Sequence, residues 1–256
     1  RDLHSFPTRR SSIWFSLNDV WKAKMLALKE LGKSEEEDCI KAWLRAKYAE
    51  SIRENRKGSA PEDFDLIGGS FHKWVRDVHA RLGLNSSEDF ERFIEEFCKF
   101  ADIYIRLRQW ESAFDEKQPY LFYNAALSFT LQSQLCLAPI RTEDLNETVE
   151  RKVLLVSRFI DIYIYTRAIN YKSMDYSTIK YAMFQLTKRI RNLDVEALVA
   201  QLGKEIADLD ISIDGAWDEF RLNSYTKKYI RHMLARITDY RSEEHTSELQ
   251  SRFSIS

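Results

Sequence analysis

The sequence predicts an all-α fold, an irregular bundle of about nine helices. Its composition is the first reason: 31% of the residues are charged, whereas the 256 residues include seven glycines and four prolines. Such a composition favours long helices over an all-β fold. The second reason is that apolar residues recur at helical spacing in long runs. The longest apolar run extends from Glu147 to Tyr171 and predicts a helix that is buried on most sides.

Two helices are expected near the start of the chain. The first covers Leu17–Leu31, with Asn18 as its candidate cap and Gly32 as its end. The second follows Ser34, and its first turn holds three glutamates that suit the positive end of a helix dipole. Its buried face is predicted from residues at helical spacing, namely Ile40, Trp43, Leu44 and Tyr48.

The clearest change of composition follows these two helices. Residues 56–69 form a predicted linker, in which Gly58 and Pro61 interrupt any helix. We therefore expect a helical pair over residues 13–55 and a helical middle domain over residues 70–240.

Three further helices are predicted in the first half of this middle domain. Ser70 begins the first of them, and Ser86 or Ser87 caps a long one that runs to about Phe114. Pro119 suits the first position of the next helix, which covers the run PYLFYNAALSFTLQSQLCL.

The central helix is expected to begin at Thr142 and to contain the long apolar run. Residues 160–165, IDIYIY, alternate with a period of two, so a strand is the alternative there. We prefer a helix because the run is far longer than a typical strand. The last three helices are predicted to begin with caps at Ser177, at Asp194 and at Asn223 or Ser224.

Charged residues within the central helix exclude a membrane span and raise a structural hypothesis. Arg158 and Asp161 are three residues apart, so they can pair on one turn. Arg167 lies near the C-terminal end of the helix, where a cation is favourable. The alternative is that all three residues simply satisfy a half-buried helix.

Both ends of the sequence resemble translated sequencing adapters. Residues 2–12 read DLHSFPTRRSS and residues 241–251 read RSEEHTSELQS, which are the strings that two common short-read adapters encode in one frame. We therefore treat residues 1–12 and 241–256 as assembly artefacts and give no function to Glu244 and His245. These segments hold five arginines and four acidic residues, so the net charge changes from −1 to −2 without them. A global basic field for nucleic acid is thus excluded.

The sequence contains no recognisable catalytic or metal site. Its three cysteines lack CxxC spacing, which indicates ordinary thiols in a reducing cytoplasm. His72 and His79 share a helix face but have no further ligands at suitable spacing. Carboxylate pairs lie on polar faces without a histidine or lysine partner. We assign no catalytic residue, no metal ligand and no cofactor to this chain.

Two basic segments are the candidate nucleic-acid contacts. The predicted helix after Ser177 carries Lys188, Arg189 and Arg191. The last predicted helix carries four more cations interleaved with tyrosines, namely Lys227, Lys228, Arg231 and Arg236. A basic helix with aromatic residues can follow a phosphate backbone, although more often it is a solvated face.

Residues 153–190, VLLVSRFIDIYIYTRAINYKSMDYSTIKYAMFQLTKRI, resemble the middle region of the GmrSD-type modification-dependent restriction proteins. The shared pattern is a leucine-rich helix that ends in tyrosine, arginine and a small residue, here Tyr165, Arg167 and Ala168. A short loop and a helix with a basic end follow it. The resemblance extends, more diffusely, to Leu17–Tyr48 and to residues 225–240, YTKKYIRHMLARITDY.

The resemblance implies a role in anti-phage defence for a larger parent protein. Members of that family carry an N-terminal nucleotide-dependent domain with an Asp-Gly-Gln-Gln-Arg motif and a C-terminal HNH nuclease domain with Glu-His. Neither motif occurs in residues 13–240. We therefore expect a non-catalytic helical connector, joined in cis to both catalytic domains and reaching DNA through its parent. The alternative is an independent helical protein-interaction module without a nucleic-acid role.

Overall fold

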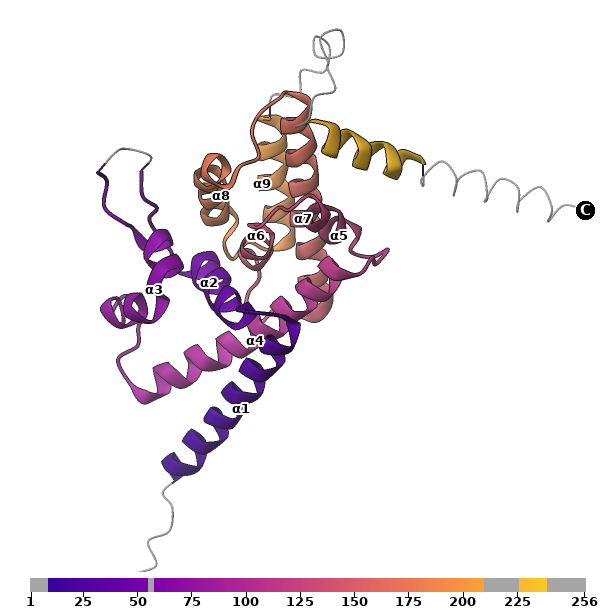
Figure 1. Ribbon diagram of the computed structural model, residues 1–256. Coiled ribbons are helices and arrows are strands. Elements are labelled where there is room, and N and C mark those ends of the chain that lie inside the picture. Colours follow the sequence, from indigo (N-terminus) through magenta and orange to yellow (C-terminus); the bar gives the residue numbers. More distant parts are fainter. Residues whose placement is uncertain (1–8, 55–57, 210–225, 239–256) are drawn as a thin grey trace, which may run out of the picture.

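The computed structural model describes residues 9–54, 58–209 and 226–238 (Figure 1). These ranges contain ten helices and no strand, which confirms the predicted all-α bundle. The tenth, at 226–238, is called the C-terminal helix below and is drawn in gold in Figure 1. The other nine are α1 (Arg9–Leu31), α2 (Glu35–Lys47), α3 (Asp63–Asp77), α4 (Ser87–Ser112), α5 (Pro119–Ala126), α6 (Gln132–Leu137), α7 (Asn146–Ile169), α8 (Tyr176–Ile190) and α9 (Val195–Ala207).

Helix α7 is central to the bundle, as the long apolar run predicts. It packs against α5, α6 and α9, while α4 joins α5 to α1 (Figure 1). Residues 160–165 lie inside α7, so the strand alternative is wrong. The side chains that face the core are almost completely buried, and they recur every three or four residues: Val149, Val153, Val156, Ile160 and Ile164.

One continuous hydrophobic core joins the early and late parts of the chain. It extends from Leu28 of α1 to Tyr229 of the C-terminal helix and includes Trp43 of α2. Helix α2 packs against both α3 and α6. The predicted N-terminal helical pair and the predicted middle domain, on either side of residues 56–69, therefore contribute apolar side chains to the same core.

Local capping signals place several helix starts where the sequence predicts them. Ser86 Oγ accepts a hydrogen bond from Asp89 N at 3.2 Å, and the Asp89 carboxylate accepts one from Ser86 N at 2.9 Å. This capping box begins α4. Asp194 caps α9 by accepting from Ala197 N at 2.8 Å, and Pro119 is the first residue of α5.

The predicted start of α3 is wrong. The helix begins at Asp63, inside the expected linker, and Ser70 marks a kink where the backbone leaves helical geometry. The Asp63 carboxylate accepts hydrogen bonds from Glu50 N at 3.0 Å and from Trp74 Nε1 at 2.8 Å, and it pairs with Arg81. Burial opposes its ionisation, but these donors outweigh burial and keep the pKa of Asp63 below its ordinary value. Asp63 thus anchors the start of α3 to the chain after α2.

Other boundaries also differ from the sequence prediction. The helix expected after Pro119 is divided into α5 and α6 at Ser128, which has a left-handed φ of 66°. The central helix begins at Asn146 and not at Thr142, and α8 begins at Tyr176, just before its predicted cap. Asn18 lies inside α1 and does not cap it.

The adapter-like segments and one predicted cap fall mostly beyond the described residues. Residues 9–12 form the first turn of α1, whereas residues 1–8 and 241–256 lie outside the described ranges. The start of the C-terminal helix predicted at Asn223 or Ser224 also lies outside them. Among the described helices, none is long and apolar enough to cross a bilayer.

Candidate functional site

The cations of α8 bond to this chain's own backbone and carboxylates. Arg191 donates from Nε to Ala46 O at 2.8 Å and from Nη2 to Ala49 O at 2.7 Å, and its third nitrogen pairs with Glu50. Lys188 donates to Glu50 O at 2.7 Å and pairs with the Glu50 carboxylate at 3.2 Å. These two side chains therefore attach the end of α8 to the end of α2.

Arg189 joins α8 to α9. Its Nε and Nη2 atoms lie 2.6 and 2.9 Å from the two carboxylate oxygens of Glu205, so the pair is bidentate. The candidate DNA contacts Lys188 and Arg189 of α8, and Arg191 directly after it, thus all make internal ion pairs.

The four cations of the C-terminal helix are divided between two roles. Lys228 donates to Leu127 O at 3.0 Å, and Arg236 donates to both oxygens of Asp161 at 2.6 and 3.2 Å. Lys227 and Arg231 are exposed and have no ionic partner among the described residues. A phosphate backbone could therefore reach Lys227 and Arg231 without breaking an ion pair to any other residue that the structure describes.

Most of the residues singled out in α7 from the sequence make contacts within the chain. The hypothesis that Arg158 pairs with Asp161 is wrong, because Arg158 is exposed and the buried Asp161 carboxylate bonds to Arg236 instead. The Tyr165 hydroxyl lies 2.7 Å from His232 Nδ1. Arg167, at the end of α7 as predicted, donates twice to Ser173 O at 3.0 and 2.6 Å and so closes the turn before α8.

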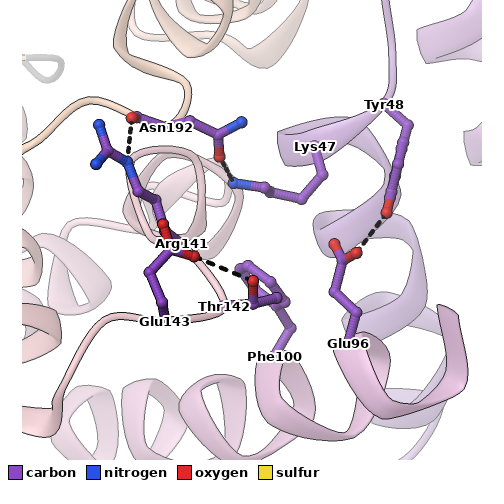
Figure 2. Close-up of a pocket in the computed structure, with 8 residues that line it drawn as sticks. All are labelled: Lys47, Tyr48, Glu96, Phe100, Arg141, Thr142, Glu143 and Asn192. Atoms are coloured by element: carbon purple, nitrogen blue, oxygen red, sulfur yellow. Dashed lines mark hydrogen bonds between the residues drawn. The ribbon is translucent and has the colours of Figure 1, made fainter. Parts of the chain in front are cut away.

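A polar cavity of about 450 Å³ lies between α2, α4 and the loop that follows α6 (Figure 2). Lys47 is its central cation and donates to Ile140 O at 2.6 Å, to Ala138 O at 3.2 Å and to the Asn192 side chain. Burial lowers the pKa of Lys47 to about 8, while the Glu96 carboxylate opposes this change. Around it the lining residues are Tyr48, Glu96, Phe100, Arg141, Thr142, Glu143 and Asn192.

Glu96 is held on the cavity wall by two aromatic donors. The Tyr48 hydroxyl donates to Glu96 Oε2 at 2.7 Å, and Trp43 Nε1 donates to Oε1 at 3.2 Å. Burial and the neighbouring Glu96 raise the pKa of Tyr48, so its phenol remains a proton donor. Figure 2 shows Tyr48 and Glu96 on the side of the cavity opposite Arg141.

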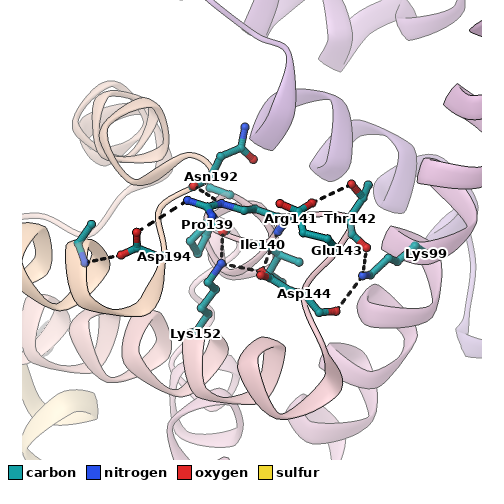
Figure 3. A network of polar contacts seen from close by, with 12 residues as sticks. Lys99, Pro139, Ile140, Arg141, Thr142, Glu143, Asp144, Lys152, Asn192 and Asp194 are labelled. Carbon is teal, nitrogen blue, oxygen red and sulfur yellow. Dashed lines mark hydrogen bonds and ion pairs between the residues drawn. The ribbon is translucent and has the colours of Figure 1, made fainter.

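The loop at residues 138–145 is bonded to three lysines from three different helices, of which Figure 2 shows Lys47 and Figure 3 shows Lys99 and Lys152. Lys47 of α2 bonds Ala138 O and Ile140 O, as described above. Lys99 of α4 donates to Asp144 O at 2.9 Å and to Thr142 O. Lys152 of α7 donates to Pro139 O at 2.9 Å and to Asp144 Oδ2 at 2.6 Å. We call these three lysines the three-lysine clamp. They donate to loop carbonyls, of which those of the buried residues 138–140 would otherwise lack donors.

The cavity suits hydrogen bonding better than catalysis. Its two cations, Lys47 and Arg141, face two carboxylates, Glu96 and Glu143, and the lining includes no histidine or cysteine. Lys47 has three acceptors, which match the three donors of an ammonium group. No group of three or more potential metal ligands occurs in the described parts of the chain. Lys47 and Glu96 therefore make their hydrogen bonds to the protein itself, and the lining residues do not form a nucleophile paired with a base.

Sequence reasoning missed the three-lysine clamp, although one signal for it was present. Lys152 stands in the apolar stripe of α7 between Val149 and Val156, and it is completely buried. A lysine inside an otherwise apolar face predicts a buried partner. Lys47 and Lys99 gave no such signal, because they lie at the margins of amphipathic helices.

No family model, curated protein or solved structure matches this chain.

Proposed function

We propose that the chain is the non-catalytic helical connector of a GmrSD-like restriction protein that cleaves modified foreign DNA in the cytoplasm. The observation that carries the proposal is the internal use of its basic side chains. Arg191 and Lys188 join α8 to the end of α2, while Arg236 joins the C-terminal helix to α7. Side chains that bind α2, α8 and the C-terminal helix to one core suit a part that sets the relative positions of flanking domains.

The proposal assigns DNA contact to the parent protein and, within this chain, to Lys227 and Arg231 alone. These two exposed residues are four apart on one helix, so they lie on the same face. The α8 cations are excluded from this role because DNA would have to compete with Glu50 and Glu205. The chain itself is expected to hydrolyse neither nucleotides nor DNA.

The decisive experiment is to recover the uninterrupted reading frame around residues 13–240 from independent sequence. The proposal expects an Asp-Gly-Gln-Gln-Arg motif upstream and a Glu-His nuclease motif downstream. A natural start near Ile13 and a stop near Tyr240 would overturn it in favour of an independent helical interaction module.

DNA binding supplies a biochemical test. The double variant Lys227→Gln/Arg231→Gln should weaken binding to duplex DNA and reduce the salt slope by roughly 1.8, about 0.9 per lost phosphate contact. The matched control is Lys22→Gln/Lys33→Gln, which removes two exposed cations near α1. Equal losses in both variants would exclude a specific contact on the C-terminal helix. Metal-dependent DNA cleavage by the purified wild-type chain would contradict a non-catalytic role.

A further inference from the structure

Arg236 occupies an aromatic cage. Its guanidinium carbon lies 4.2 Å from the ring centre of Tyr123, 5.5 Å from that of Tyr165 and 5.9 Å from that of Tyr120. Two of its nitrogens bond to the carboxylate of Asp161, which is 7% exposed. The group is thus paired with a carboxylate and faced by three tyrosine rings, an arrangement that suits a planar cation.

The residues that surround Arg236 lie on α5 and α7, which we call the body of the protein, and not on the C-terminal helix. Tyr120 and Tyr123 come from α5, whereas Asp161 and Tyr165 come from α7, and these two helices pack directly against each other. In the complete structure the C-terminal helix covers the Asp161 carboxylate, and Arg236 is its cationic partner there. If Arg236 is removed, the carboxylate and the three rings remain available to bind another planar cation.

The C-terminal helix is seated shallowly on this body. Seven of its thirteen described residues are exposed, including Leu234 and Ile237, and the buried ones are Thr226, Tyr229 and Ile230. Its distal half therefore depends on polar contacts, of which the Arg236–Asp161 pair and the His232–Tyr165 bond are the main ones. Contacts of this kind fix orientation and can be exchanged for equivalent ones with a ligand.

We propose that α5 and α7 form a guanidinium-binding site, which the chain fills with its own Arg236, so that the C-terminal helix is a displaceable latch. The ligand class is an alkylguanidinium, meaning an arginine side chain or a small analogue. Lysine fits less well, because an ammonium cannot make the bidentate bond to Asp161 and stack on Tyr123 at the same time. This proposal does not depend on the connector role or on any flanking domain.

Chemical rescue tests the site directly. In Arg236→Ala, hydrogen exchange of the amides at 226–238 should accelerate at least tenfold, while exchange of the α7 core at residues 153–164 stays unchanged. Millimolar N-ethylguanidinium should bind this variant, with saturation in calorimetry, and should restore the protection. Ethylammonium at the same concentration should not restore it. Wild type should bind neither compound at millimolar concentration, because its tethered Arg236 outcompetes them, but a large excess of N-ethylguanidinium should displace Arg236.

Two further variants make the test decisive. Arg236→Ala/Asp161→Asn removes the carboxylate, so N-ethylguanidinium should no longer bind. Arg236→Lys keeps the charge and should give intermediate protection, which provides a readout if Arg236→Ala does not fold. Absence of N-ethylguanidinium binding to Arg236→Ala, equal rescue by ethylammonium, or faster exchange throughout α7 in Arg236→Ala would each overturn the proposal.

Discussion

Lys152 Nζ lies 2.6 Å from Asp144 Oδ2, and the lysine is completely buried. The pair joins the second turn of α7 to the loop that precedes it, and the same ammonium satisfies Pro139 O (Figure 3). A buried charge of this kind specifies one position for the loop, because any displacement would leave both partners unsatisfied.

Replacing Lys152 with methionine should therefore destabilise the fold strongly. The variant leaves the Asp144 carboxylate without its cation and Pro139 O without a donor. We expect a loss of about 3–5 kcal/mol in the free energy of unfolding, measured by urea denaturation. Lys99→Met is the control, because Lys99 is half-buried and donates to loop carbonyls, so its loss should be about 1–2 kcal/mol. Equal losses in the two variants would contradict this explanation.

Glu35 joins α2 to α4, and its partners should be energetically coupled. It accepts hydrogen bonds from the Tyr104 hydroxyl at 2.7 Å and from Arg108 Nε and Nη2 at 3.1 and 2.7 Å. Tyr104→Phe should cost about 1 kcal/mol, and Glu35→Gln about 2–3 kcal/mol because Arg108 loses one of its two carboxylate partners and keeps Glu111. The double variant should cost less than the sum of the two, by roughly 0.5 kcal/mol or more. Strict additivity in denaturation experiments would show that the three groups act independently.

Lowering the pH should weaken the packing of the C-terminal helix, because His232 becomes protonated. Burial lowers the pKa of His232 below its ordinary value of 6.5, and the positive charges of Arg236 and Lys228 act in the same direction, while Asp161 opposes them. A folded-state pKa below the unfolded one means that the unfolded chain binds more protons, so stability falls as the pH drops below about 6.5. The variant His232→Gln has no imidazole at this position and so cannot bind the extra proton. Between pH 7.5 and pH 5.5, the unfolding free energy of wild type should therefore fall by more than that of the variant. An equal fall in both proteins would contradict the prediction.

The three free cysteines should react in a fixed order. Cys39 and Cys136 are wholly buried, and burial raises the pKa of both thiols. Burial also raises the pKa of Cys98, but Lys24 opposes this change, and the thiol lines a cavity of about 590 Å³ beside α4 and α7. Native-state alkylation followed by mass spectrometry should label Cys98 first, whereas all three should react at similar rates in urea. Labelling of Cys136 before Cys98 would be incompatible with this packing.

Features of the fold that depend on residues close together in the sequence could be predicted from the sequence alone. The apolar period identified α7, and the signals at Ser86, Asp194 and Pro119 placed three helix starts, because a cap is satisfied within its own first turn. The start of α3 could not be predicted in this way, since Asp63 is fixed by Trp74 and Arg81 as well as by Glu50 N.

The roles of the charged residues were much less predictable. Arg191 and Arg236 have the same sequence context as solvated or DNA-facing cations, yet their partners lie 145 and 75 residues away along the chain. Only the packing of helices brings such groups together, so no spacing rule reveals them. Lys152 is the exception, because its place in an apolar stripe predicts a buried ionic partner.

The bond from Arg191 to Ala46 O also bears on how the protein is made. The carbonyls at the end of α2 receive their donor from a residue that the ribosome adds 145 positions later. At about 5–20 residues per second, translation separates the two by roughly 7–30 seconds. During that interval the carbonyls of Ala46 and Ala49, at the end of α2, lack the Arg191 guanidinium that later donates to them. Closure of the bundle is therefore a late event of synthesis, and a chain released before residue 191 would leave these carbonyls to solvent or to a chaperone.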